Sequence, residues 1–163
     1  MSKILKIIGY TWAFPVTLIG LTYASTFKMM GWYKWHGVEG DALVWLVDHS
    51  KSPNWLKNSW EGWGGHAIGN VIVLSESPQI KPMTLKHEQK HVDQVMKLGI
   101  FQPFIYAISS IGIYLGCPGS DHYYSNPFEI DARRHAGQII DVEGYVKKIN
   151  EIKVKNEKEK LSC

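Results

Sequence analysis

Two long stretches of the chain are almost free of charged residues. The first, Ile4 to Phe27, is interrupted only by Lys6 and has the length that a membrane-spanning helix requires, about 20 residues. The second, Leu98 to Cys117, is uncharged but less hydrophobic, because it includes serines, glycines and a proline. Both stretches are predicted to be helical, and Pro15 favours a break inside the first helix.

Three arrangements fit these apolar stretches, and the sequence leaves the choice open. The two helices could cover each other as a hairpin, in the core or at a membrane surface. The first helix could instead cross a membrane. It could also act as an export signal, with small residues for cleavage near Ala24. The cytoplasm, a membrane and export are therefore all possible locations.

The region between the apolar stretches has the pattern of a mixed α and β domain. β-Branched residues from His66 to Leu74, with glycines before them, predict one strand. A helix is predicted from Thr84, as its cap, to Leu98, since apolar positions recur there with helical spacing. Residues 48–65 are rich in turn-forming residues and are expected to form a loop.

Length and charge restrict the class of protein. With 163 residues, the chain is expected to hold one domain, 1–146, followed by a charged tail, 147–163. The tail segment Lys147–Lys160 carries six lysines and three glutamates, a net charge of 6 − 3 = +3, which equals the charge of the whole chain. The remainder is therefore balanced, and nucleic acid is not expected as a partner. The two cysteines do not indicate a redox compartment.

The sequence His87-Glu88-Gln89-Lys90-His91 has the pattern H-E-x-x-H, and it falls inside the predicted helix. Residues four apart lie on one face of a helix, so both imidazoles can point at a single metal ion. Glu88 lies beside them and can take a proton from a metal-bound water as a general base. The pattern indicates a zinc site of the kind found in metallopeptidases.

A third ligand is expected from a later helix. Asn126 and Pro127 have the residue types that begin a helix, which is predicted to run towards Tyr145. Glu129 falls in its first turn and could complete a His₂Glu zinc site. The same residue could instead reach back to the Asn126 amide as a capping-box glutamate, and the sequence leaves both roles open.

The strand 66–74, the H-E-x-x-H helix and Asn126-Pro127-Phe128-Glu129 together resemble the gluzincin metallopeptidases, in particular the minimal members called minigluzincins and related uncharacterised H-E-x-x-H proteins. The resemblance runs from about His66 to His135. It implies a zincin-like α+β fold with a small antiparallel sheet, an active-site helix and a glutamate helix, here with an apolar helical segment at 1–30.

The resemblance also implies roles for individual residues. His87, His91 and Glu129 become the zinc ligands and Glu88 the general base. The strand becomes the rim that pairs with an extended peptide, an interaction in which main-chain hydrogen bonds supply the affinity. The residues of that rim are Ile68, Gly69, Asn70, Val71 and Ile72.

The chain departs from the gluzincin pattern in two respects. Many gluzincins have an acidic residue one turn after the glutamate ligand, whereas this chain has Arg133. Asp131, Arg133 and Arg134 are interpreted as surface charges. No single residue stands out as the donor to the oxyanion, and the candidates nearby are His122, Tyr123, Tyr124 and His135.

The expected function is a zinc-dependent peptidase that hydrolyses a peptide or protein substrate. The alternative is a non-catalytic, zinc-stabilised, membrane-associated interaction domain. A third interpretation is a helical membrane protein in which the motif is accidental. A His₂-carboxylate set could also hold iron or manganese.

Overall fold

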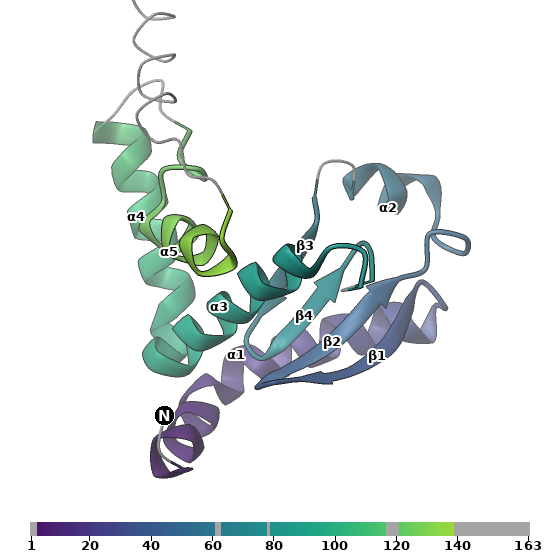
Figure 1. Cartoon of the computed structure of the whole chain (residues 1–163), viewed down its shortest axis with the longest axis horizontal. Coiled ribbons are helices and arrows are strands. Elements are labelled where there is room, and N and C mark those ends of the chain that lie inside the picture. Colours follow the sequence, from purple (N-terminus) through teal and green to yellow (C-terminus); the bar gives the residue numbers. More distant parts are fainter. Residues whose placement is uncertain (1–2, 61–62, 78, 117–120, 139–163) are drawn as a thin grey trace, which may run out of the picture.

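The computed structural model describes residues 3–60, 63–77, 79–116 and 121–138 and has an α+β fold with a small sheet (Figure 1). The predicted tail, 147–163, lies outside the described residues. In chain order, the elements are α1 (Lys3–Met29), β1 (Tyr33–Glu39), β2 (Ala42–Val47), α2 (Asn54–Ser59), β3 (Gly65–Ile68), β4 (Val71–Leu74), α3 (Pro82–Leu98), the 3₁₀ turn η1 (Gly99–Phe101), α4 (Gln102–Gly116) and α5 (Pro127–Ala136).

The sheet has four strands in the order β1-β2-β4-β3 and is mixed rather than antiparallel. The pairs β1–β2 and β3–β4 are antiparallel, whereas β2 and β4 are parallel. The chain passes through α2 and β3 between β2 and β4, and a crossover of this kind is what a parallel pair requires. The prediction of an antiparallel sheet is therefore wrong for the central pair, β2 and β4.

The predicted strand from His66 to Leu74 is wrong in one respect, because it is two strands that form a hairpin. Ile68 pairs with Val71, and the two residues between them make the turn. Gly69 has a φ of 61°, which suits the first position of a two-residue hairpin turn. The Cα of Thr17 in α1 would lie only 2.4 Å from a Cβ at this glycine, so the turn also needs glycine for the close approach of α1.

Helices cover both faces of the sheet. In Figure 1, α3 lies in front of the strands and α1 lies behind them. On the α3 face, Val92 and Val95 belong to one buried cluster with Ile72 and Leu74. On the other face, Ala24 of α1 is fully buried in a second cluster, which includes residues of β1, β2 and β4. The core thus lies in two layers, one on each side of the sheet.

The helix α1 belongs to the folded domain and is continuous through Pro15. Small residues, Gly9, Ala13, Gly20 and Ala24, form its buried face and permit close packing. A Cβ at Gly20 would lie 2.3 Å from the carbonyl oxygen of Ile68. Cleavage after Ala24 would remove this layer of the core, which argues against the interpretation as an export signal. The predicted break at Pro15 is wrong, because the inner face packs on both sides of it.

The arrangement in which the two apolar stretches cover each other is found only at the start of the second stretch, where α1 contacts η1. Otherwise α1 packs mainly against α3 and strands β1, β3 and β4. By length and composition alone, Lys3–Met29 and the helical stretch Pro82–Gly116 each contain a window that could cross a membrane. Their surroundings in the fold must decide whether they do.

The structure differs from the sequence-based prediction at three element boundaries. The expected loop 48–65 contains the short helix α2. The helix α3 begins at Pro82, so Lys81 rather than Thr84 is its cap residue. The helix α5 ends at Ala136, because Gly137 takes a left-handed conformation that terminates it. The predicted continuation towards Tyr145 is thus wrong at Gly137, and residues 139–145 lie outside the described residues.

Candidate metal centre

The helix α3 carries three of the predicted site residues in little more than one turn. His87 and Glu88 are 6% and 5% exposed, and the imidazole rings of His87 and His91 lie with their centroids 4.9 Å apart. The i, i+4 spacing places both rings on one face of the helix, as predicted. The three polar side chains are therefore directed into the protein rather than towards bulk water.

The helix α5 supplies Glu129, and its start is fixed by Asn126. The Asn126 side chain accepts a hydrogen bond from the backbone N–H of Phe128, 3.0 Å, and donates to the hydroxyl of Ser110 in α4, 2.7 Å. Asn126 is thus a true N-cap, as predicted. Its own backbone N–H donates to the carbonyl of Tyr123, which leaves the Glu129 carboxylate without a capping-box role.

The three potential ligands converge. The Nε2 atoms of His87 and His91 are 3.2 Å apart, and they lie 3.2 Å and 3.3 Å from the two carboxylate oxygens of Glu129. One ligand atom from each residue falls within 4.8 Å of the others, so the group could hold a metal ion. Tetrahedral ligands with bonds of about 2.0–2.1 Å are separated by about 3.3 Å. The donor set therefore fits a small divalent ion.

Each imidazole is held through its other nitrogen by a glutamine. The Nδ1 atom of His91 lies 2.8 Å from the amide oxygen of Gln94, and Nδ1 of His87 lies 3.2 Å from the amide oxygen of Gln138. The Gln94 amide nitrogen donates to the carbonyl of Phe128 and to the carboxylate of Asp131, at 3.1 Å each. This fixes the amide oxygen as the acceptor from His91, so the lone pair of His91 lies on Nε2, where a metal would need it.

The surroundings raise the pKa of Glu88 and lower the pKa of Glu129. Burial raises the pKa of Glu88 to about 7, against the opposing influence of the two imidazoles. Burial alone would also raise the pKa of Glu129, but the imidazoles of His87 and His91 hold it below its usual value. The site therefore contains one carboxylate that stays ionised and one that can exchange a proton near neutral pH.

The four residues His87, Glu88, His91 and Glu129 line a cleft of about 920 Å³. One wall comes from Gly64, Gly65 and Ala67, at the edge of the sheet, and the opposite wall includes Tyr106 of α4 and Arg133 of α5. Of the predicted oxyanion donors, three line the cleft, and His135 lies on the exposed side of α5 outside this lining. The three in the lining are His122, Tyr123 and Tyr124.

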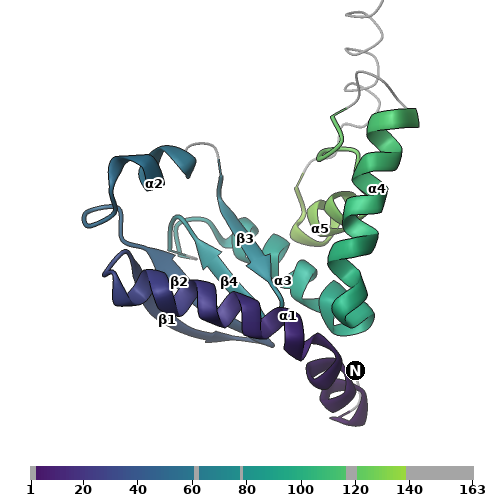
Figure 2. The same cartoon turned by 180° about the vertical axis from the view of Figure 1, so that it is seen from behind.

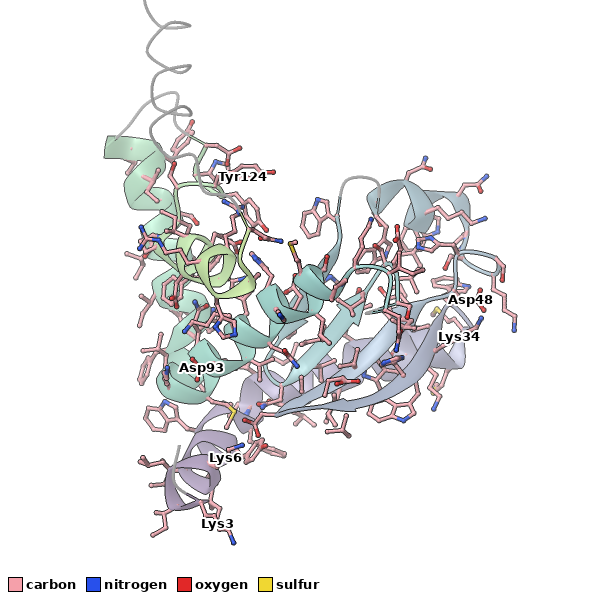
Figure 3. The ribbon with its side chains drawn as sticks, in the orientation of Figure 1. Lys3, Lys6, Lys34, Asp48, Asp93 and Tyr124 are labelled. Carbon is pink, nitrogen blue, oxygen red and sulfur yellow. The ribbon has the colours of Figure 1, made fainter. Side chains whose placement is uncertain are left out.

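Two residues beside Glu129 were not singled out from the sequence as part of the site. The hydroxyl of Tyr106 donates to a Glu129 carboxylate oxygen, 3.0 Å. The guanidinium of Arg133 lies 3.9 Å from the other oxygen, and its side chain is only 11% exposed. It also lies over the ring of Tyr124, 4.1 Å from the centroid; Tyr124, labelled in Figure 3, belongs to the segment before α5. The interpretation of Arg133 as a surface charge is wrong, and its i, i+4 spacing from Glu129 was the available signal.

The edge of the sheet that faces the cleft differs from the predicted rim. Val71 and Ile72 belong to the central strand β4, where they are 1% and 0% exposed and pair with strands on both sides. Gly69 and Asn70 form the turn, so Ile68 alone of the predicted rim residues lies on the edge strand. Of the two edge strands, β1 and β3, it is β3 that borders the cleft. A Cβ at Gly65 would lie 3.2 Å from Cγ of Glu88, so this edge passes directly beside the site.

The role of Gln94 gives a prediction. Replacing Gln94 with alanine is expected to weaken metal affinity by about 10–100-fold, because His91 loses the partner that fixes its tautomer and ring orientation. Competition with a chromogenic chelator measures this affinity. Gln89→Ala, on the same helix but directed to the carbonyl of Glu39, is the matched control and should bind normally. Equal affinities of the two variants would show that Gln94 does not orient the ligand.

In comparisons with known proteins, no protein-family model, no characterised protein and no solved structure matches the chain. Its function has to be inferred from the chemistry of the site itself.

Proposed function

We propose that this protein is a zinc-dependent peptidase of the gluzincin kind with a zincin-like fold. The observation that supports it most is the convergence of His87, His91 and Glu129 on one point, with the buried carboxylate of Glu88 beside them. Two imidazoles and one carboxylate are the ligand set of several catalytic zinc sites, in which the fourth position is left for water. Zinc, when bound, supplies the Lewis acidity that polarises a carbonyl and makes water acidic near neutral pH.

The residues of the chain would divide the remaining work. Glu88 accepts the proton of the attacking water and returns it to the leaving amine, a role that suits a carboxylate with a pKa raised to about 7. The edge strand β3 offers main-chain groups to an extended peptide along the cleft. On the opposite wall, the hydroxyl of Tyr123 and the guanidinium of Arg133 can donate hydrogen bonds to negative charge that develops on the substrate.

Metal analysis combined with chelation tests the proposal. The purified protein is expected to contain one zinc ion per chain and to cleave an unfolded protein such as reduced casein. A chelator should abolish the cleavage, and a stoichiometric amount of zinc should restore it. Stoichiometric zinc without turnover of any unfolded substrate would instead identify a zinc-stabilised domain. Protein without any metal, even after incubation with zinc, would contradict both.

A further inference from the structure

The helix α4 presents its polar residues to the protein and its apolar residues to the outside. The whole helix, Gln102–Gly116, contains no charged residue, and none of its residues is buried. Its inward face includes Ser110, which accepts a hydrogen bond from Asn126, and Tyr106, which donates to Glu129. This is the inverse of a helix on a water-exposed surface. The large exposed side chains, 39% to 70% accessible, are Phe104, Ile105, Ile108, Ile111, Tyr114 and Leu115.

The helix α1 has the same inverted character. Its small residues, with Val16, Leu21, Tyr23 and Phe27, face the core, while its other large apolar residues face outward. Lys6 is the only charged residue in the apolar part, and it is paired with Asp41 at 2.8 Å. The exposed apolar side chains, 42% to 72% accessible, are Ile4, Leu5, Ile7, Ile8, Tyr10, Trp12, Phe14, Leu18 and Ile19.

The threonines on the outer side of α1 have no need of an external partner. The hydroxyls of Thr11, Thr22 and Thr26 each donate to the carbonyl four residues earlier, at 3.0, 2.9 and 2.8 Å. Polar side chains that are satisfied within their own helix can be placed in hydrocarbon at little cost. A helix face in contact with lipid requires such internal hydrogen bonds, whereas a face in contact with water does not.

The two outer faces are continuous and lie on one side of the molecule. Seen from behind, α1 lies in front of the sheet and α4 lies in front of α5 (Figure 2). Trp12 of α1 meets Phe101 of η1, the residue before α4, with ring centroids 5.9 Å apart. At the start of α1, Lys3 projects from the end of this apolar face (Figure 3). A lysine in that position can reach the headgroup region of a bilayer.

We propose that this face, made by the outer residues of α1 and α4, rests in one leaflet of a lipid bilayer and does not cross it. An apolar face this large is rare on a water-soluble monomer. The packing of α1 argues against crossing, because Gly9, Ala13, Gly20 and Ala24 on its inner side are buried against the rest of the fold. The described part of α4, with 15 residues, reaches about 22 Å, less than the hydrocarbon core of about 30 Å.

Membrane attachment would place the cleft beside the lipid, because Gln102, Pro103 and Tyr106 of α4 line the cleft while the outer residues of the same helix face the bilayer. The attachment does not depend on the proposed peptidase activity, and it can be tested on protein with or without metal.

Flotation with vesicles tests the attachment. The full chain, transferred from detergent to phosphatidylcholine vesicles, is expected to float with them. Leu18→Lys combined with Ile108→Lys should lower the vesicle-bound fraction at least about tenfold, since one charge enters each helix face. The control Val38→Lys changes an apolar residue of β1 that is 64% exposed outside this face and should float normally. Circular dichroism is expected to be the same for all variants.

Three results would overturn the proposal. The wild-type chain could stay at the bottom of the gradient, or the double variant could float as well as the control. The chain could also form a lipid-free, water-soluble dimer that the double variant dissociates, which would make a second copy the occupant of this face. Labelling tests the topology: Lys3→Cys and Met30→Cys, each in a Cys117→Ser, Cys163→Ser background, should both react with an impermeant reagent from outside the vesicles. Protection of one end alone would be a fourth result against the proposal, because it would mean that α1 crosses the bilayer.

Discussion

Replacing Glu88 with glutamine is expected to lower the rate of peptide hydrolysis by about a thousandfold while the metal content stays at one ion per chain. Glu88 is 5% exposed and its pKa is raised to about 7, so it can accept and return a proton under neutral conditions. Glutamine has nearly the same shape but cannot carry the proton, and loss of a general base typically costs about 10²–10⁴ in rate.

The experiment compares kcat/KM for an unfolded or fluorogenic peptide substrate in the wild type and the variant, with zinc measured on the same samples. Glu76→Gln is the matched control, because this glutamate is exposed and paired with Lys81 at 2.9 Å; it should retain full activity. A Glu88→Gln protein that cleaves at the wild-type rate would contradict the assignment of the general base. Loss of zinc in this variant would show that Glu88 has a structural role at the metal.

The part of the site that the sequence predicted correctly depends on local rules. The spacing of His87 and His91 determines that they share a helix face once the segment is helical. The cap formed by Asn126 and Pro127 was predictable because it involves only neighbouring residues. The same local rules left two roles open for Glu129, that of a capping-box residue and that of a metal ligand. In the structure its carboxylate lies beside the imidazoles of His87 and His91 in α3 instead of at the cap.

The parts that could not be predicted depend on contacts between distant segments. Gln94 and Gln138 look like ordinary polar residues in the sequence, and their role appears only when α3 and α5 pack together. The turn at Gly69 is different, because Gly69-Asn70 between two runs of strand-forming residues is a local signal of a two-residue hairpin turn, which the prediction of a single strand overlooked. Only the close approach of Thr17 from α1, a second reason for glycine at this position, is not visible in the sequence.

The two apolar stretches show the same contrast between what local patterns predict and what only the folded structure reveals. Length and hydropathy predicted two helices correctly, but they could not distinguish a core helix from one that faces lipid. The burial of Gly20 and Ala24 on one side of α1, with Leu18 and Ile19 exposed on the other, makes that distinction. A hydropathy window averages the two faces of a helix, so the inverted polarity of α4 is lost in it as well.

Replacing Glu129 with glutamine is expected to weaken zinc binding at least about a hundredfold and to abolish hydrolysis with it. The carboxylate lies 3.2 Å and 3.3 Å from the two imidazole Nε2 atoms and is the only negative charge of the three ligands. Glutamine preserves an acceptor for the hydroxyl of Tyr106 but removes that charge, and neutral amides are poor zinc ligands.

Competition with a chromogenic chelator measures the affinity, and elemental analysis gives the stoichiometry. Glu39→Gln, which changes a half-exposed glutamate near His36, is the control and should bind zinc like the wild type. The order of effects separates the roles of the two glutamates: Glu88→Gln keeps zinc and loses turnover, whereas Glu129→Gln loses both. If zinc affinity were unchanged in Glu129→Gln, the ion would lie elsewhere, and the carboxylate held between His87 and His91 would be a structural ion pair rather than a metal ligand.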